Sequence, residues 1–249
     1  ADMLGAYYSK VVDSKVIFDK LKISKNDDYL EKLNKYNVIS ISFAEIDSNC
    51  SNCVEYIDRI SNLLREDLKE KFPKANIDEK YTIWEVFSQL DEKFIFIFDE
   101  WDYIFNANIF EEDQDKFLEF LMKLLKDKPY VALAYMTGIL PIKKYSSGSS
   151  LNMFDEFTIL NDMIYGEYFG FTEEEVKMLC DKQISISFDE ISSWYNGYLS
   201  EEGSRIYNPR SVIKALKNKK CKSYWTNTGA MDEVEEYLKY NILEIRDEV

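Results

Sequence analysis

Residues 93–102, which read Lys-Phe-Ile-Phe-Ile-Phe-Asp-Glu-Trp-Asp, constrain the fold of this chain more than any other stretch. Positions 94–98 are all apolar residues with a strong preference for strands, and no polar residue interrupts them. A strand of this kind is buried on both faces, which is typical of the interior of a parallel sheet with helices on either side. We therefore expect an α/β fold in which this strand lies inside the sheet.

Acidic side chains follow at the point where the predicted strand ends. In open α/β sheets, ligands bind outside the carboxyl ends of the strands, so Asp99 and Glu100 are expected at the functional edge. A Walker B element has this form: Asp99 supports a hydrated Mg²⁺ bound mainly through triphosphate oxygens, and Glu100 polarises the attacking water. Asp102 is close enough in sequence to brace either group. The alternative is a buried strand that ends in a solvated acidic turn.

The size and charge of the chain narrow the choice of partner. With 249 residues, 46% of them hydrophobic, it can bury one large core, with or without a small appendage. Its formal net charge of −15 makes nucleic acid a poor partner, because nucleic-acid binding depends on Lys and Arg that neutralise phosphates. A nucleotide bound to Mg²⁺ remains a suitable partner, since the metal offsets the negative charge.

Histidine is absent from these 249 residues, and four cysteines occur. The absence excludes Ser-His-Asp and Cys-His catalysis and histidine metal sites within the sequence. Cys50 and Cys53 are close, but Cys180 and Cys221 form no second pair, so we expect reduced thiols rather than a zinc site. No apolar run is long enough to cross a bilayer and no signal peptide begins the sequence, so we expect a soluble, cytoplasmic protein without membrane contact.

Helical and strand patterns alternate along the chain. They predict helices at residues 1–8, 27–36, 54–72, 81–90 and 113–125, and strands at 38–43, 94–98, 130–136 and 158–160. The run at 130–136 is continuously apolar and so predicts another interior strand. Right-handed crossover connections then place the carboxyl ends of the strands at one edge of the sheet.

Thr137 stands at the end of the strand predicted at 130–136 and precedes Gly138. P-loop ATPases place a small hydroxyl residue at the end of the strand beside Walker B, where it detects the γ-phosphate or the attacking water. Thr137 is therefore a candidate sensor. The alternative is that it is a turn residue that only ends the strand.

Several further segments, taken in order, carry a resemblance to a known family. They are Gly-Ile-Leu-Pro-Ile-Lys-Lys-Tyr at 138–145, Leu-Asn-Met-Phe-Asp at 151–155, Phe-Gly-Phe-Thr-Glu-Glu-Glu-Val at 169–176, Trp-Tyr-Asn-Gly-Tyr at 194–198, Tyr-Asn-Pro-Arg-Ser-Val at 207–212 and Tyr-Trp-Thr-Asn-Thr-Gly at 224–229. With Asp-Glu-Trp-Asp at 99–102, the chain resembles the bacterial AAA-ATPase-like family. Members of that family typically carry a P-loop ATPase domain and, further along, a nuclease-like domain of the restriction-endonuclease type. The resemblance implies that Asp99 and Glu100 are the Walker B pair and that Thr137 is the sensor.

The resemblance also implies a Gly-Lys-Ser or Gly-Lys-Thr P-loop directly before Met-Leu-Gly-Ala-Tyr-Tyr at 3–8. None of the eight glycines opens a G-x-x-x-x-G-K-[ST] pattern, so we expect the loop to lie outside this sequence and the chain to be a truncated piece of a longer protein. These residues alone should then bind ATP weakly. The first strand of the sheet would be absent too, and we expect another segment or molecule to cover the apolar edge that it leaves.

Two groups of basic residues are further candidates for phosphate binding. Lys143 and Lys144 lie in a polar loop at 141–150, from which they could reach phosphate oxygens, although solvated loop lysines are an equally good interpretation. Arg210 is placed like a lid arginine or an arginine that acts on a neighbouring molecule. The basic run at 214–222 favours a solvated helix end over a nucleic-acid site.

Residues 166–249 predict a helical lid or winged-helix-like appendage to an ATPase-like core at 1–165. Thr172 and Glu175 form a capping-box pattern at one helix start, and Pro209 follows Asn208 at another. The aromatic residues at 194, 195, 198, 207, 224 and 225 favour a core over stacking on adenine. Residues 231–245 predict a final acidic helix.

Together with the resemblance, these patterns predict a module that binds and hydrolyses ATP with Mg²⁺. The resemblance implies that this module switches an attached, nuclease-like effector domain, and a homo-oligomer is one assembly that we consider. The alternative is a scaffold with a degenerate nucleotide site, which binds a partner without turnover. Direct cleavage of nucleic acid by the Asp99 cluster is disfavoured, because a restriction-type nuclease needs separated acids followed by a Glu-x-Lys-like element on a hairpin.

Overall fold

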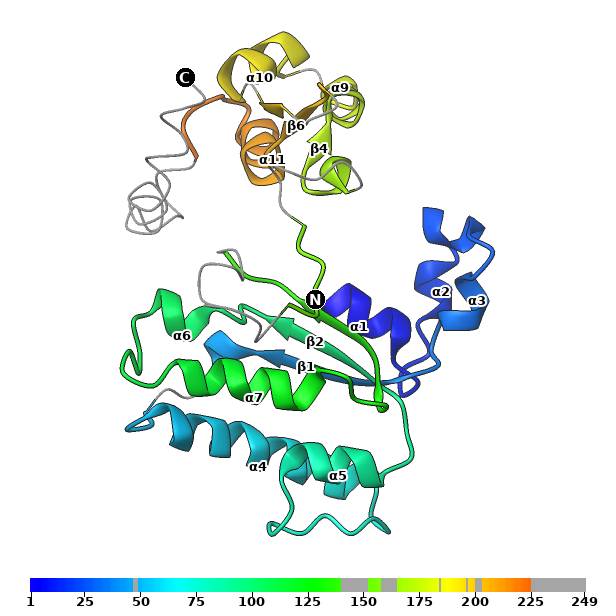
Figure 1. Ribbon diagram of the computed structural model, residues 1–249. Coiled ribbons are helices and arrows are strands. Elements are labelled where there is room, and N and C mark those ends of the chain that lie inside the picture. Colours follow the sequence, from blue (N-terminus) through cyan, green and yellow to red (C-terminus); the bar gives the residue numbers. More distant parts are fainter. Residues whose placement is uncertain are drawn as a thin grey trace. The chain divides into compact units, whose positions relative to one another are not determined.

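The computed structural model describes residues 1–46, 49–139, 152–157, 165–183, 185–195, 197–199 and 203–224. The chain divides into two compact units, Ala1–Asp155 and Glu156–Val249, and each has a hydrophobic core of its own (Figure 1). The boundary predicted after residue 165 remains a prediction. The predicted strand at 158–160, the loop at 141–150 and the helix at 231–245 lie outside the described residues.

The first unit contains a parallel sheet in the order β1-β2-β3. Its strands are β1 (Asn37–Ser42), β2 (Phe94–Asp99) and β3 (Val131–Met136). Both strand pairs are parallel, with Phe98 beside Ile41 on one side and Met136 on the other. The α/β class and the interior position of the strand at 94–98 are therefore confirmed.

The central strand β2 is buried on both faces, as its unbroken apolar run predicts. Phe94, Phe96 and Phe98 are at most 1% exposed and belong to one cluster with the helices below the sheet. Those helices are α4 (Cys53–Lys71), α5 (Ile83–Gln89) and α7 (Asp115–Leu125). On the opposite face, a Cβ built on Gly5 would lie 3.7 Å from Ile97 Cδ1, so the helix α1 (Asp2–Tyr8) packs closely there (Figure 1).

Strand β3 lies at the edge of the described sheet, so the interior position predicted from its apolar run is wrong for this part of the structure. Leu133 and Tyr135 are 37% and 43% exposed, in contrast to the buried residues of β2. No strand among the described residues pairs with this edge, and its cover by another segment or molecule remains a prediction.

The segment between α1 and β1 differs from its prediction. In place of one helix over 27–36, only the short helix α3 (Tyr29–Lys32) forms within that range, and α2 (Lys15–Phe18) and the 3-10 turn η1 (Lys22–Lys25) precede it. Asn34 adopts a φ of 56°, and its N–H donates to Tyr7 O at 2.8 Å, while the Tyr36 N–H donates to Tyr8 O at 2.9 Å. These contacts with the end of α1 draw the chain out of the helix before Tyr36.

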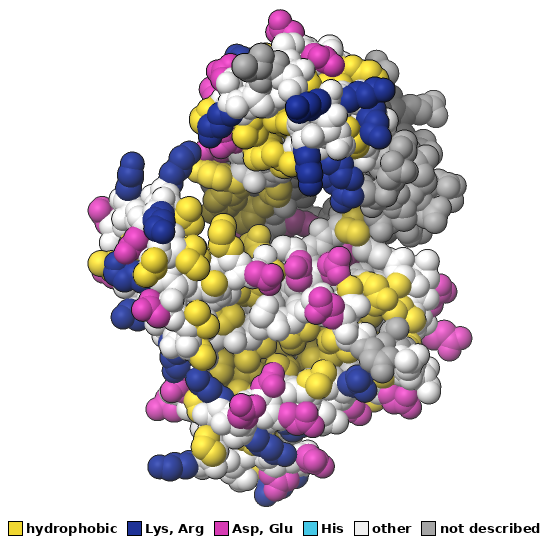
Figure 2. All heavy atoms as spheres, turned by 180° about the vertical axis from the view of Figure 1, so that it is seen from behind, with side chains coloured by type: hydrophobic (Ala, Val, Ile, Leu, Met, Phe, Trp, Pro, Cys, Tyr) yellow, Lys and Arg dark blue, Asp and Glu magenta, His cyan; other side chains and the backbone are white. Residues whose placement is uncertain are grey.

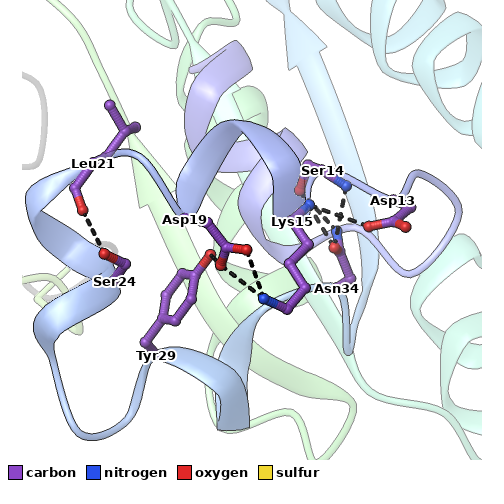
Figure 3. Close-up of polar contacts among 8 residues, drawn as sticks. All are labelled: Asp13, Ser14, Lys15, Asp19, Leu21, Ser24, Tyr29 and Asn34. Carbon is purple, nitrogen blue, oxygen red and sulfur yellow. Dashed lines mark hydrogen bonds and ion pairs between the residues drawn. The ribbon is translucent and has the colours of Figure 1, made fainter.

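A small polar network holds α2 against α3 (Figure 3). The Asp19 carboxylate accepts hydrogen bonds from Lys15 Nζ at 2.7 and 2.8 Å and from the Tyr29 hydroxyl at 2.9 Å. The hydrogen bond from Lys15 is the main cause that lowers the pKa of Asp19, and the Tyr29 hydroxyl adds to it. Tyr29 itself is buried against Tyr7, whose hydroxyl donates to Tyr29 O at 2.9 Å.

The second unit combines helices with a small antiparallel sheet in the order β4-β6-β5. Its elements are η3 (Gly166–Tyr168), β4 (Phe171–Thr172), α9 (Glu173–Asp181), α10 (Phe188–Tyr195), β5 (Tyr198–Leu199), β6 (Arg205–Tyr207) and α11 (Pro209–Asn218). The predicted capping box is confirmed, because the Glu175 N–H donates to Thr172 Oγ1 and the Thr172 N–H to Glu175 Oε2. The predicted start at Asn208 is confirmed too, since its side chain accepts from the Ser211 N–H at 3.0 Å.

The aromatic residues of this unit divide between core and surface. Tyr207 and Tyr224 are buried with Val212, as predicted for a core, whereas Trp194 is 55% exposed. Residues 203–224 contain no Asp or Glu, and their basic residues are Arg205, Arg210, Lys214, Lys217, Lys219, Lys220 and Lys222. Lys and Arg side chains gather on the face of this unit that Figure 2 shows, at the top of the view.

The remaining short elements of the first unit are η2 (Phe43–Glu45) and α6 (Tyr103–Asn106), which follow β1 and β2. All four cysteines are described, and no disulfide joins any of them. None of the described helices has both the length and the apolar character that a bilayer crossing requires.

The order of the strands predicts that truncation of an interior side chain lowers the free energy of unfolding more than truncation of a side chain on the edge strand. Phe96→Ala should lower the free energy of unfolding by about 3–5 kcal/mol, because Phe96 is fully buried in β2. Leu133→Ala, on the exposed edge of β3, should cost no more than about 1 kcal/mol. Urea denaturation of both variants checks the difference, and equal costs would contradict the observed order of the strands.

In this network Lys15 and Tyr29 both lower the pKa of Asp19, and Lys15 lowers it more. Lys15→Met should raise the pKa of Asp19 toward its ordinary value of 3.8, and Tyr29→Phe should raise it less. Because the pKa is lower in the folded state, this stabilisation is present above pH 3.8 and is lost as the pH falls through the folded-state pKa. Carboxyl carbon shifts in an NMR titration measure these changes, and an unchanged pKa in both variants would contradict the network.

Candidate functional site

The carboxyl ends of β2 and β3 are held together by backbone hydrogen bonds. The Thr137 N–H donates to Phe98 O at 2.8 Å, and Thr137 O accepts from the Trp101 N–H at 3.0 Å. Thr137 thus continues the pairing of β3 with β2 and then contacts the segment that follows β2. These two bonds fix the position of the Thr137 backbone relative to the acidic residues.

Asp99 and Thr137 meet at this edge of the sheet. The Thr137 hydroxyl donates a hydrogen bond to Asp99 Oδ1, although the two residues are 38 positions apart in the sequence. Both side chains are partly buried. The structure therefore brings together two of the candidate site residues, and their proposed roles remain predictions.

Glu100 begins a sharp turn directly after Asp99. Its φ of 50° lies in the left-handed region, which a Glu residue rarely adopts. Glu100 O accepts from the Tyr103 N–H at 3.0 Å, so the turn leads directly into α6. The residue is exposed at the edge of the sheet that also carries Asp99.

Ser42 is a further residue at this edge that the sequence analysis did not single out. It is the last residue of β1, and in the parallel register its Cα is paired with that of Asp99. The ends of the three strands therefore carry a hydroxyl, a carboxylate and a second hydroxyl in one row, from Ser42 through Asp99 to Thr137. The signal in the sequence was a second Ser at the end of an otherwise β-rich run, but its alignment with Asp99 depends on the register of the sheet.

The other candidates are not among the described residues of the first unit. Lys143 and Lys144 lie outside the described residues. Arg210 is exposed near the start of α11, which belongs to the second unit, whereas Asp99 belongs to the first.

The oxygen atoms at the strand ends suit a magnesium ion that takes most of its ligands from elsewhere. Carboxylate and hydroxyl oxygens are hard donors, and Mg²⁺ usually keeps several waters and phosphate oxygens beside one or two protein ligands. Within the described ranges, no group of three or more His, Cys, Asp or Glu residues could hold a metal by itself. Asp99, with its two hydroxyl neighbours, therefore fits a magnesium–nucleotide complex better than a protein-only metal site.

The left-handed conformation of Glu100 predicts a stability difference between two glycine substitutions. Glu100→Gly should be more favourable than Glu111→Gly by about 1 kcal/mol, because glycine adopts a positive φ without steric cost. Glu111 is an exposed turn residue that is not among those with a positive φ, so it serves as the control. Thermal denaturation measures both, and a larger loss at Glu100 than at Glu111 would contradict the strained turn.

Comparison with known proteins identifies a protein family. No curated protein and no solved structure matches the sequence. The model of the AAA-ATPase-like family, described as "Predicted AAA-ATPase", matches residues 1–147, which is more than half of the 249 residues. The matched range includes β1, β2 and β3 and the strand-end residues Ser42, Asp99 and Thr137. The chain therefore belongs to the AAA-ATPase-like family.

Proposed function

We propose that this chain is the catalytic part of an ATP-hydrolysing protein. In this proposal Asp99 supports Mg²⁺, Glu100 orients and polarises the attacking water, and Thr137 detects the γ-phosphate. The observation that carries it is the hydrogen bond from the Thr137 hydroxyl to Asp99 at the ends of adjacent parallel strands, in a chain of this family.

The geometry fits the chemical needs of phosphoryl transfer. The reaction is accelerated mainly by positioning and by electrostatic stabilisation, so fixed side chains contribute more than reactive ones. The Thr137 backbone is fixed by two hydrogen bonds, while its hydroxyl can rotate from Asp99 Oδ1 to a nearby phosphate oxygen. Binding of a magnesium–nucleotide complex would thus release Asp99 from Thr137 and give each side chain a new partner.

The proposed site also needs a P-loop, whose backbone N–H groups bind the phosphates. The 249 residues contain no G-x-x-x-x-G-K-[ST] pattern, so we propose that a P-loop from outside this sequence holds the phosphates. The strand that leads into it would pair with the outer edge of β3, beside Thr137. By themselves these residues would bind nucleotide weakly. Lys143, Lys144 and Arg210 are proposed as additional phosphate contacts on the basis of the sequence alone.

We also propose that nucleotide turnover switches an attached effector domain. The support is the family resemblance, in which a nuclease-like domain typically follows the ATPase. The second unit serves as a lid or winged-helix-like connector in this proposal; its small antiparallel sheet β4-β6-β5, with α9 and α10 between β4 and β5, supports such an arrangement. A cytoplasmic location and a homo-oligomeric assembly remain proposals of the same kind.

Substitution of Glu100 tests the proposed hydrolysis. The assay uses the full-length protein, including the proposed P-loop. Glu100→Gln should lower kcat for ATP by about 10²-fold while nucleotide affinity is retained, because the amide cannot polarise water as a carboxylate does. Asp99→Asn should weaken the Mg²⁺ dependence of binding as well. Phosphate release and nucleotide binding are measured at several Mg²⁺ concentrations, with Glu70→Gln, an exposed acid of α4, as the control.

The outcomes separate the proposal from its alternative. Hydrolysis that neither Glu100→Gln nor Asp99→Asn reduces would rule out the assigned catalytic roles. Nucleotide binding without turnover in the unmodified protein would instead favour a scaffold with a degenerate nucleotide site.

A further inference from the structure

A buried carboxylate lies directly beneath the strand end that carries Thr137. Asp102 is 0% exposed, and its Oδ2 accepts a hydrogen bond from the Ile139 N–H at 2.9 Å. Its backbone is anchored as well, because Asp102 O accepts from the N–H groups of Phe105 and Asn106 at 3.0 Å each. Asp102 therefore joins the start of α6 to the segment that follows Thr137.

Gly138 permits this close approach. A Cβ at this position would lie 2.6 Å from Trp101 Nε1 and 2.8 Å from Asp102 Oδ1, which is closer than real Cβ atoms come to other atoms. Trp101 is only 2% exposed and so has little room to move away. Any side chain at 138 would push the segment away from Asp102.

We propose that Asp102 is a positioning residue for Thr137. Three hydrogen bonds fix this strand end: Thr137 N–H to Phe98 O, Trp101 N–H to Thr137 O, and Ile139 N–H to Asp102 Oδ2. None of them involves Asp99. The Thr137 hydroxyl can therefore leave Asp99 for another oxygen atom without any movement of its backbone.

The Asp102 side chain is suited to this task by its burial. A hydrogen bond in surroundings of low polarity is stronger than one exposed to water. Asp102 thus acts on the site through the backbone of residues 137–139. Only the use of the positioned hydroxyl rests on the proposed function; the positioning itself is a property of the chain without nucleotide.

Amide hydrogen exchange of the 249-residue chain, followed by NMR without nucleotide, tests the positioning. Asp102→Ala should speed exchange of the Ile139 amide about tenfold, because its acceptor is removed, with smaller increases at Thr137 and Trp101. The amides of β1 should not change. Asp102→Asn should restore most of the protection, since its side-chain oxygen can still accept the hydrogen bond.

Two further variants complete the experiment. Asp113→Ala is the control, and Gly138→Ala disturbs the Asp102–Ile139 hydrogen bond from its other side. Asp113 Oδ1 accepts from the Cys53 N–H at 3.3 Å, so Asp113→Ala should affect that amide and leave Ile139 unchanged. Gly138→Ala should reproduce the local pattern of Asp102→Ala by displacing Ile139. If Asp102→Ala does not fold, Gly138→Ala still tests the proposal.

Two results would overturn the proposal. The first is unchanged exchange of Ile139 in both Asp102→Ala and Gly138→Ala. The second is an equal increase across β1, β2 and β3, because that would show a contribution to general stability only. If the local pattern is found but the intact protein does not hydrolyse ATP, the positioning stands and the proposed function fails.

Discussion

The structure of the first unit depends on the burial of β2 on both faces. Its three phenylalanines face the helices α4, α5 and α7, and Ile97 faces α1 on the other side. Because residues 94–98 are buried away from water, the backbone N–H and C=O groups of the strand must be paired, and β1 and β3 provide that pairing. This arrangement leaves the polar residues of the segment at its end, where Asp99 and Glu100 follow the last buried phenylalanine.

Because the strands are parallel, their polar end residues lie close together and form the candidate site. All three carboxyl ends lie at one edge, so Ser42, Asp99 and Thr137 form a row although they are far apart in the sequence. The backbone bonds of Thr137 and the buried carboxylate of Asp102 then fix the end of β3 independently of Asp99. The result is a rigid edge that carries rotatable hydroxyls beside one carboxylate, which is the kind of preorganisation that electrostatic catalysis requires.

Local sequence signals predicted those elements that are determined by residues within the element itself. The helix over 54–72 was confirmed within a residue at each end, since Asn52 caps it and its apolar residues recur at helical spacing. The segment 27–36 was predicted wrongly because hydrogen bonds from Asn34 and Tyr36 to α1 outweigh its helical pattern. The edge position of β3, the alignment of Ser42 with Asp99 and the Asp102–Ile139 contact depend on how separate segments pair, so periodicity along one segment could not reveal them.

The central claim, that Asp99 and Thr137 share one magnesium–nucleotide site, is tested most directly with Mn²⁺ as a paramagnetic substitute for Mg²⁺. The intact protein would carry labelled threonine methyl groups and be titrated with Mn²⁺ and a non-hydrolysable ATP analogue. We expect the Thr137 methyl signal to broaden strongly, and the broadening to be lost in Asp99→Asn. A Thr137 signal that stays sharp while methyl groups elsewhere in the chain broaden would contradict a metal site at the ends of β2 and β3.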